Sequence, residues 1–431
     1  MNFPHLQNSV DRLLSSVRPD TARILDGALS GAEITTEEAA GLFDSEGPEL
    51  LAMIAAADYL RSKTVGDVVT YVINRNINFT NVCVKACGFC AFSRGHLAEQ
   101  GYFLPTDEIV RRAREARELG ATEVCVQAGL APGIDGWHYV RLCRALKEAL
   151  PDLHIHGFSP EEVLYGATLS GVSILEYLLA LKEAGVGSLP GTSAEILVDE
   201  VRQQLSPGRI TTAQWTDLIQ TAHELGIPTT STIMYGHIES SYHKAVHLSL
   251  LRDIQKRTRG ITEFVPLSFV YEEAPMSHRK RLAGLRQGAS GAEVMKMYAV
   301  SRLMLNSWIP NLQVSWVKEG PKLSQIALMA GANDFGGTLI NESISTAAGA
   351  SYGQLMKPSQ FRGLIRDMGR IPAERSTTYD KIRVFDAEDD SLGVLDTVEN
   401  PAERFGSYHN LISQKAYRFR EFYRDQKDRK Q

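Results

Sequence analysis

The sequence is poor in cysteine, in long hydrophobic runs and in surplus charge of either sign. Its 431 residues include five cysteines, too few for a disulfide scaffold. No stretch approaches the ~18 consecutive apolar residues that a membrane span needs. The net charge of −5 provides no general basic field for nucleic acid or anionic lipid. These absences exclude disulfide-stabilised domains, membrane-spanning proteins and proteins that bind nucleic acid through a broad basic surface.

The remaining composition is that of a folded, globular protein. Hydrophobic residues make up 43% and charged residues 23% of the chain, which excludes disordered and fibrous proteins. The N-terminal sequence lacks a charged segment followed by an apolar core and a small-residue cleavage site. We therefore expect a cytoplasmic protein without nucleic-acid or membrane partners.

Three of the five cysteines lie within eight residues, as Cys83-Val-Lys-Ala-Cys87-Gly-Phe-Cys90. Thiolates are soft ligands that suit iron–sulfur clusters and zinc. A structural zinc site takes four protein ligands, and the nearest histidine, His96, lies six residues after the third cysteine. Three cysteines on a 4Fe–4S cluster leave one iron open to a small molecule. The spacing favours such a cluster, with zinc or a plain electron-transfer cluster as alternatives.

Short strand patterns alternate with amphipathic helix patterns after an all-helical start at residues 1–62. Alternation on this scale predicts a parallel sheet, and eight units can close into a barrel. The expected helices cover 105–119, 136–150, 159 onward, 174–184, 212–225, 242–257, 292–305 and 323–330. The expected strands cover 68–79, 123–127, 153–158, 186–189, 228–234, 264–268, 312–316 and 333–335.

The predicted fold is therefore α/β, a TIM-type (β/α)8 barrel with additions at both ends. We divide the chain into an N-terminal helical segment (1–67), the barrel (68–337) and a C-terminal helical extension (338–431). The extension is expected to be irregular at first, to pack on the barrel and to end in a frayed basic tail. Active sites of such barrels lie at the carboxyl ends of the strands. The cysteine triplet follows the first predicted strand at once, which places it there.

The triplet, with Phe89 just before its third cysteine, resembles the signature of the radical S-adenosylmethionine superfamily. The resemblance implies a radical barrel fold, with a 4Fe–4S cluster held by Cys83, Cys87 and Cys90. It further implies that S-adenosylmethionine binds the fourth iron and yields a 5′-deoxyadenosyl radical. The protein supplies ligation, orientation and exclusion of solvent.

Longer motifs are similar to one branch of this superfamily and together cover about residues 25–385. The branch contains menaquinone-pathway enzymes (aminofutalosine synthase and dehypoxanthine futalosine cyclase) and the two radical enzymes of FO synthase. The cysteine segment and Arg375-Ser-Thr-Thr-Tyr379 most resemble the tyrosine-using half of FO synthase. The sequence departs from its relatives at Ala128, where glycine is more usual. The matching segments are 74–83, 87–94, 154–161, 189–197, 230–239 and 336–349.

This resemblance implies a transferase that makes a carbon–carbon bond in synthesis of the deazaflavin FO. It would cleave the Cα–Cβ bond of L-tyrosine and add the 4-hydroxybenzyl group to C5 of 5-amino-6-(D-ribitylamino)uracil. A menaquinone-branch enzyme that acts on a futalosine-type substrate is the alternative. The reaction would need an electron donor such as ferredoxin or flavodoxin. Because the sequence has one cysteine triplet, ring closure would fall to a separate radical subunit.

The resemblance also assigns roles to residues at the expected strand ends. Seven residues are expected to bind the cofactors, and Glu195 and Arg209 among them are expected to bind the polar end of S-adenosylmethionine. His237 and Glu239 are expected to be catalytic, as proton acceptors for tyrosine. Asn341 and Glu342 are expected to hydrogen-bond the uracil or the ribityl hydroxyls, whereas Cys125 and Cys143 are expected to be buried thiols that bind no metal. The expected cofactor-binding residues are Phe89, Phe92, Gln127, Gly129, Glu161, Glu195 and Arg209.

Overall fold

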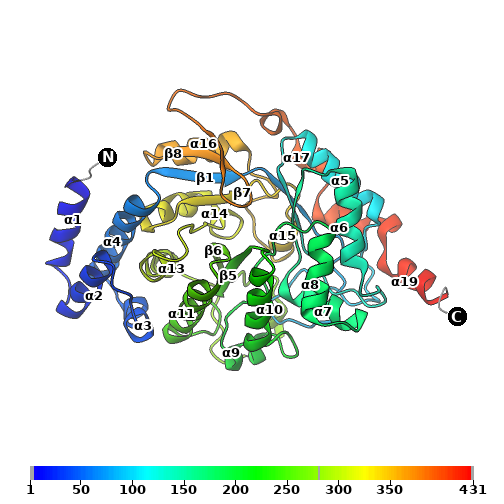
Figure 1. Ribbon diagram of the computed structural model, residues 1–431, viewed down its shortest axis with the longest axis horizontal. Coiled ribbons are helices and arrows are strands. Elements are labelled where there is room, and N and C mark those ends of the chain that lie inside the picture. Colours follow the sequence, from blue (N-terminus) through cyan, green and yellow to red (C-terminus); the bar gives the residue numbers. More distant parts are fainter. Residues whose placement is uncertain (1–3, 280–281, 429–431) are drawn as a thin grey trace.

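The centre of the computed structural model, which describes residues 4–279 and 282–428, is a set of parallel strands arranged in a ring (Figure 1). The strands are β1 (Val68–Val72), β2 (Asn74–Ile77), β3 (Glu123–Val126), β4 (His154–His156), β5 (Thr229–Tyr235), β6 (Ile261–Ser268), β7 (Asp334–Gly337), β8 (Ile371–Arg375) and β9 (Lys381–Val384). Strands β1 to β7 are mostly buried, as expected for strands covered by helices outside and by packed side chains inside, whereas β9 is exposed.

Parallel pairings run round the ring and close it. β2, β3 and β4 pair in order, β5 pairs with β6, and β7 pairs with β1. Single bridges join these sheets, from His156 to Ser188, from Leu189 to Thr229, and through residues 312–313 to β6 and β7. The predicted strands at 186–189 and 312–316 therefore contribute only isolated bridges. The predicted barrel is confirmed, with eight strand positions around its axis.

Helices surround the ring, and most begin where the sequence predicts. Side-chain oxygens of Ser or Thr satisfy backbone N–H groups at the starts of α7, α8, α10, α11 and α13, each in a capping box. The short helix α9 was not predicted. The barrel helices are α5 (Thr106–Glu118), α6 (His138–Ala149), α7 (Pro160–Ser170), α8 (Ile174–Glu183), α9 (Asp199–Leu205), α10 (Thr212–Glu224), α11 (Ser241–Thr258), α12 (Pro275–Arg279), α13 (Gly291–Leu305), α14 (Trp316–Ala327) and α15 (Ile344–Ala347).

The N-terminal segment is helical, as predicted, and lies to one side of the barrel (Figure 1). Its helices are α1 (Pro4–Leu14), α2 (Pro19–Leu29), α3 (Thr36–Asp44) and α4 (Pro48–Thr64). α3 packs on α11 and α4 packs on α13. In the described residues no single helix is both long and apolar enough to cross a membrane; only α7 and α8, bent by 105° where they meet, satisfy that test as a pair.

The C-terminal extension is more regular than the sequence predicts. β8 pairs in parallel with β1 on the side opposite β7, and β9 pairs with β8 in the antiparallel sense. The second residue of β8 is Pro372, which has no N–H to donate and therefore disfavours a strand in a pattern-based reading. α16 (Pro358–Asp367) packs against β8. The start of the extension thus completes the sheet beside the first strand.

The expected frayed tail is also corrected in part, because α19 (Phe419–Asp428) docks at its start. The side chain of Phe419 is fully buried, and its N–H donates to the carbonyl of Gly101 over 2.9 Å. Phe422 stacks on Phe103 with ring centroids 4.2 Å apart. The aromatic residues of this helix therefore hold it to the segment that follows the cysteine loop. Residues 429–431 lie outside the described residues.

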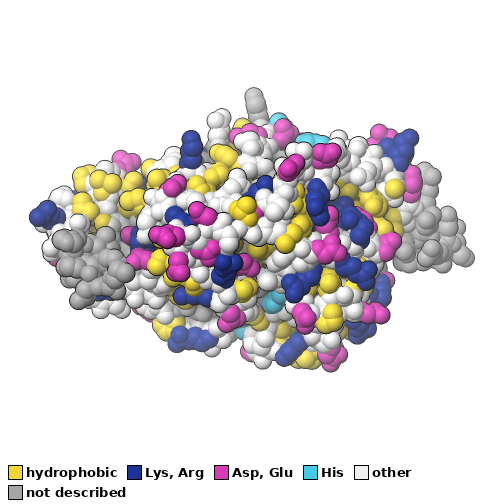
Figure 2. All heavy atoms as spheres, turned by 90° about the horizontal axis from the view of Figure 1, so that it is seen from above, with side chains coloured by type: hydrophobic (Ala, Val, Ile, Leu, Met, Phe, Trp, Pro, Cys, Tyr) yellow, Lys and Arg dark blue, Asp and Glu magenta, His cyan; other side chains and the backbone are white. Residues whose placement is uncertain are grey.

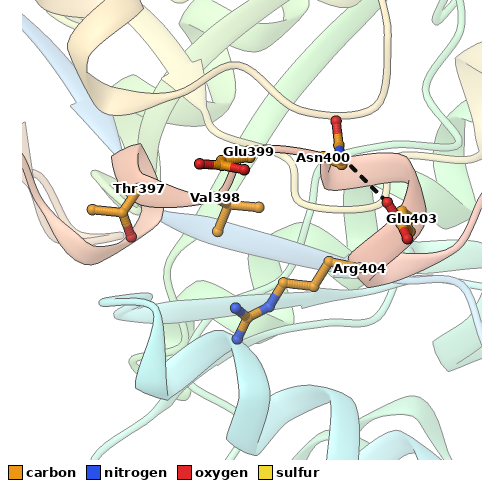
Figure 3. Close-up of a pocket in the computed structure, with 6 residues that line it drawn as sticks. All are labelled: Thr397, Val398, Glu399, Asn400, Glu403 and Arg404. Carbon is orange, nitrogen blue, oxygen red and sulfur yellow. Dashed lines mark hydrogen bonds between the residues drawn. The ribbon is translucent and has the colours of Figure 1, made fainter.

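On the face shown in Figure 2, acidic and basic side chains are interspersed, in keeping with the small net charge. A hollow of about 370 Å³ lies beside α17 (Pro401–Phe405), which precedes α18 (Tyr408–Ser413) in the chain. Figure 3 draws the side chains that line it. It is lined by residues 397–400, Glu403 and Arg404, and none of the predicted site residues belongs to it.

Candidate active site

A cavity of about 390 Å³ opens at the carboxyl ends of the barrel strands. Its lining comes from the loops that follow β2, β3, β4 and β7 and from the segments around residues 192 and 315. Predicted residues that line it are Cys83, Cys87, Cys90, Phe89, Phe92, Gln127, Gly129, Glu161, Glu195, Arg209 and Glu342. Predicted residues outside the lining are His237, Glu239 and Asn341.

Backbone hydrogen bonds fix the cysteine loop at both ends of the triplet. The N–H of Cys83 donates to the carbonyl of Arg94 over 3.1 Å, and the N–H of Arg94 donates to Asn81 over 2.8 Å. The guanidinium of Arg94 in turn donates to the carbonyl of Ala91 over 2.7 Å. The loop therefore has a defined shape although it contains no helix and no strand.

Two glycines let backbone segments approach closely around this loop. Gly88 donates to the carbonyl of Leu205 over 2.8 Å and accepts from the N–H of Met276 over 2.7 Å. A side chain at Gly129 would place its Cβ 2.3 Å from the carbonyl oxygen of Val82. Glycine is therefore required at 129 by space, whereas Ala128 is accommodated beside it, and the departure from the usual motif is tolerated.

Arg209 joins two predicted carboxylates at one wall of the cavity. Its guanidinium lies 3.0 Å from Glu195 and 3.3 Å from Glu161, and it donates to the hydroxyl of Ser193 over 2.6 Å. It also lies 3.6 Å from the sulfur of Cys87. Burial raises the pKa of the Cys87 thiol to about 12, and the Arg209 cation acts against this rise. Sequence-distant residues thus form one charged cluster beside the triplet.

The predicted aromatic and amide residues of the site contact other parts of the cavity wall and of the C-terminal extension. Phe89 lies 6.0 Å from the Arg209 guanidinium, and Phe92 packs on Tyr102 and on Tyr408, which the C-terminal extension supplies. The side-chain oxygen of Gln127 accepts from Thr192 over 2.9 Å, so the turn at 127–129 is tied to the next loop of the barrel.

His237 and Glu239 occupy a buried network instead of the cavity. Glu239 accepts from the N–H groups of Gly236 and His237 and pairs with Arg286, while a ring nitrogen of His237 lies 2.9 Å from the carbonyl oxygen of Met234. Burial lowers the pKa of His237. Both side chains have protein partners that shape the turn after β5, and the expected catalytic role of this pair stays a prediction.

Asn341 and Glu342 separate in the structure. Glu342 lines the cavity and accepts from the N–H of Ser345 over 2.8 Å, at the start of α15. Asn341 does not line the cavity, and it adopts a φ of 66°. The positive φ suits asparagine better than most residues, and the expected substrate contacts of Asn341 and Glu342 stay predictions.

Several functional candidates were missed by sequence reasoning. Lys85, between the first two cysteines, lies 3.3 Å from Glu161. Gln313 and Lys318 line the cavity from the segment before α14 and from its first turn. Gln313 and Lys318 belong to no sequence motif, and only the closure of the barrel brings these two residues close to the cysteine triplet. Glu162 has no predicted role either, although the capping-box pattern that begins at Ser159 signals its position.

Glu162 is a buried carboxyl group that lines the cavity. It accepts from the Ser159 hydroxyl over 2.6 Å and from the N–H of Ala128 over 2.9 Å. Burial raises its pKa to about 7, and the hydrogen bonds act against that rise. It therefore links the start of α7 to the turn that follows β3.

Glu162 should make stability depend on pH. A carboxyl group with a raised pKa in the folded state binds its proton more tightly there, so its favourable contribution is lost as pH rises through about 7. Relative to the wild type, Glu162→Gln is expected to gain about 2 kcal/mol of unfolding free energy between pH 5.5 and 8.5. Urea unfolding at both pH values measures this gain.

Glu176→Gln is the matched control, because Glu176 holds the equivalent place in the capping box of α8. Its pKa is lowered by the Ser173 N–H, so its titration falls below the tested range. The Glu176 variant should show no change between the two pH values. An equal pH dependence in both variants would contradict the assignment to Glu162.

The residues present fit an iron–sulfur cluster held by three cysteines. All three thiols line one cavity. Across residues 4–279 and 282–428, no group of three or more His, Cys, Asp or Glu side chains is placed to hold a single metal ion. Each thiol of a cubane binds its own iron, so the ligands stand further apart than they do around one zinc ion.

Comparison with known proteins agrees with this geometry. The model of the radical SAM superfamily matches residues 77–248. The solved structure of methylornithine synthase aligns with a TM-score of 0.60 at 21% identity, over 81% of this chain and 97% of that one. The hydrogenase maturase HydG aligns with a TM-score of 0.62 at 18% identity, over 86% and 79%. Fold and site define a radical SAM enzyme, which uses a 4Fe–4S cluster and S-adenosylmethionine.

Curated relatives narrow the family. A 5-amino-6-(D-ribitylamino)uracil–L-tyrosine 4-hydroxyphenyl transferase of Methanothermobacter thermautotrophicus is 48% identical over 367 residues, 85% of this chain and 99% of the relative. The enzyme of that name from Methanocaldococcus jannaschii is 49% identical over 350 residues, 80% of this chain and 96% of the relative. A model of the CofH/MqnC C-terminal region matches residues 258–387. The chain belongs to the family of these 4-hydroxyphenyl transferases.

Proposed function

We propose that this chain cleaves the Cα–Cβ bond of L-tyrosine and adds the 4-hydroxybenzyl group to C5 of 5-amino-6-(D-ribitylamino)uracil. The product would serve synthesis of the deazaflavin FO. The observation that carries this proposal is the match to transferases of that name along nearly their whole length, at 48–49% identity. The cavity adds support, because it brings the cysteine triplet and a polar wall together.

When bound, the cluster and S-adenosylmethionine supply an electron and a carbon radical that abstracts hydrogen. In our proposal Cys83, Cys87 and Cys90 hold the cluster. Arg209, Glu161 and Glu195 orient the polar end of S-adenosylmethionine, and the turn from Gln127 to Gly129 lies against it through backbone groups. Phe89 and Phe92 complete the apolar wall.

The surrounding protein has a second task, which is to exclude water. A carbon radical attacks solvent or protein unless the substrate is already in place. The C-terminal extension contributes here, because Tyr408 packs on Phe92 and α19 docks behind the cysteine loop. We propose that residues 338–431 serve the barrel as a cover of this kind.

The proposal includes partners that the reaction chemistry requires. A one-electron donor such as ferredoxin or flavodoxin would reduce the cluster. A separate radical subunit would close the deazaflavin ring, since this sequence contains one cysteine triplet. We propose a cytoplasmic location, where reduced donors are present.

Isotope-labelled tyrosine tests the reaction. The reconstituted enzyme is given S-adenosylmethionine, a reductant, the ribitylaminouracil and L-tyrosine labelled with ¹³C at Cβ or at Cα. Mass spectrometry should find a hydroxybenzyl adduct that carries the Cβ label and lacks the Cα label. Formation of 5′-deoxyadenosine without this adduct would overturn the substrate assignment.

The menaquinone branch is the second candidate, because the C-terminal family model is shared by CofH and MqnC. The same assay with futalosine-type substrates discriminates the two. Turnover of such a substrate, together with no tyrosine adduct, would favour the menaquinone reaction.

A further inference from the structure

Lys318 is a cation that faces the cavity without an anion. It lies in the first turn of α14 and lines the cavity. The side chain keeps part of its surface accessible, and it belongs to the lining of the cavity. Throughout the described part of the chain, its ammonium group forms no hydrogen bond and no ion pair.

The acidic groups nearest to Lys318 are already engaged elsewhere. Glu342 accepts from the N–H groups of Ser345 and Thr346, over 2.8 and 3.3 Å. Glu319 accepts from the hydroxyl of Tyr235 over 3.1 Å. Burial lowers the pKa of Lys318, and the charges of Glu342, Glu319 and Cys90 act against that change. A buried cation without a close partner is costly in the unliganded protein.

The other cations of the cavity differ in this respect. Arg209 is paired with Glu161 and Glu195, and Lys85 is paired with Glu161. Their charges are therefore balanced within the protein. Among the lysine and arginine side chains that line the described cavity, only Lys318 has no ion-pair partner. Its charge is therefore available to a ligand.

The chemistry of the proposed substrates identifies that ligand. The ribitylaminouracil offers carbonyl, amine and hydroxyl groups and no full negative charge. Tyrosine offers an α-carboxylate, which is ionised at neutral pH, whereas its phenol is not. A lysine ammonium binds a carboxylate as a compact point charge.

We propose that Lys318 binds the α-carboxylate of the substrate amino acid and so positions tyrosine for cleavage. This inference rests on the proposed function. The methionyl part of S-adenosylmethionine carries the same chemical group, so the test must separate the two amino acids. Gln313 lies on the same side of the cavity, and its amide oxygen is 3.4 Å from the Arg375 guanidinium, which leaves the amide N–H₂ group for the ligand.

Binding measurements on the cluster-loaded protein test the proposal. Lys318→Met is compared with the wild type for L-tyrosine, tyramine, 3-(4-hydroxyphenyl)propanoate and S-adenosylmethionine. The variant should bind L-tyrosine and the propanoate ~10–100-fold more weakly than the wild type does, because both ligands carry the carboxylate. Affinities for tyramine and S-adenosylmethionine should stay unchanged. Lys318→Arg should retain most of the tyrosine affinity, since it keeps the charge.

Lys322→Met is the matched control, because Lys322 lies on the same helix and is exposed. It should leave all four affinities unchanged. Thermal unfolding adds a second readout, in which Lys318→Met should raise the Tm of the ligand-free protein by removing an unpaired charge. A lysine with a structural role would give the opposite change.

The possible failures are distinguishable. Equal tyrosine affinity in the wild type and Lys318→Met overturns the inference and leaves the proposed function intact. If Lys318→Met binds S-adenosylmethionine more weakly and tyrosine equally well, Lys318 contacts the cofactor. That result also overturns the inference. If the wild-type protein binds no tyrosine in the presence of S-adenosylmethionine, that result contradicts the proposed function and also the inference that rests on it.

Discussion

Replacement of Cys87 by alanine is expected to abolish formation of 5′-deoxyadenosine, by at least ~10³-fold. Cys87 is the middle cysteine of the triplet and the most buried of the three, with 8% of its surface exposed. Its loss leaves two protein ligands for a cluster that needs three. Iron content, cluster absorbance and deoxyadenosine yield after anaerobic reconstitution measure the effect together.

Cys143→Ala is the matched control for this prediction. Cys143 is fully buried in α6 and does not line the cavity. Its replacement should cost some stability through lost packing, with iron content and deoxyadenosine formation retained. If Cys87→Ala still held a full cluster and formed deoxyadenosine, the assignment of the triplet as the cluster ligands would be wrong.

Arg375→Met is expected to lower the unfolding free energy by about 3–5 kcal/mol, because it leaves buried carboxylates without their cation. Arg375 lies at the end of β8 and donates to both oxygens of Asp334, over 2.5 and 3.0 Å. It also lies 3.4 Å from Glu263 and stacks on the ring of Tyr379 at 4.0 Å. This network fills the barrel below the cavity, and urea unfolding at pH 8 measures its contribution.

The loss should be smaller at pH 5.5 than at pH 8. Burial raises the pKa of Glu263, so a lower pH protonates this group and reduces the need for a cation. Arg383→Met is the matched control, since Arg383 is half exposed on β9 and pairs with Asp389 at the surface. That variant should change stability by less than ~1 kcal/mol. Equal losses at 375 and 383 would refute a special role for the buried network.

The sequence predicted the barrel because its signals are local. Alternating strand and helix patterns, and helix starts such as Ser159-Pro-Glu-Glu162, are set by residues near each other in the chain. β8 escaped prediction because its proline breaks the strand pattern, and its pairing with β1 and β9 stabilises it in the fold. The docking of α19 was missed for a similar reason, since Phe419 finds its partners more than 300 residues earlier.

The site divides in the same way. The cysteine triplet, the turn at Gly129 and the carboxylates at 161 and 195 follow short motifs, and all of them line the cavity. His237 and Glu239 also belong to a motif, yet their side chains form hydrogen bonds within the protein and do not line the cavity. A motif fixes which residue follows a strand, but the surrounding packing fixes the direction of its side chain.

By itself, the sequence indicated the cofactor through its resemblance to a known signature, because three thiols within eight residues keep their spacing in any fold. It also predicted the barrel, because the apolar faces of alternating strands and helices must be buried against one another. Only the tertiary structure decided which charges in the cavity are balanced. Arg209 meets Glu161 and Glu195 across 48 and 14 residues of chain, while Lys318 forms no ion pair within the residues that the structure describes. Charge balance depends on distances between remote residues, and only folding sets these.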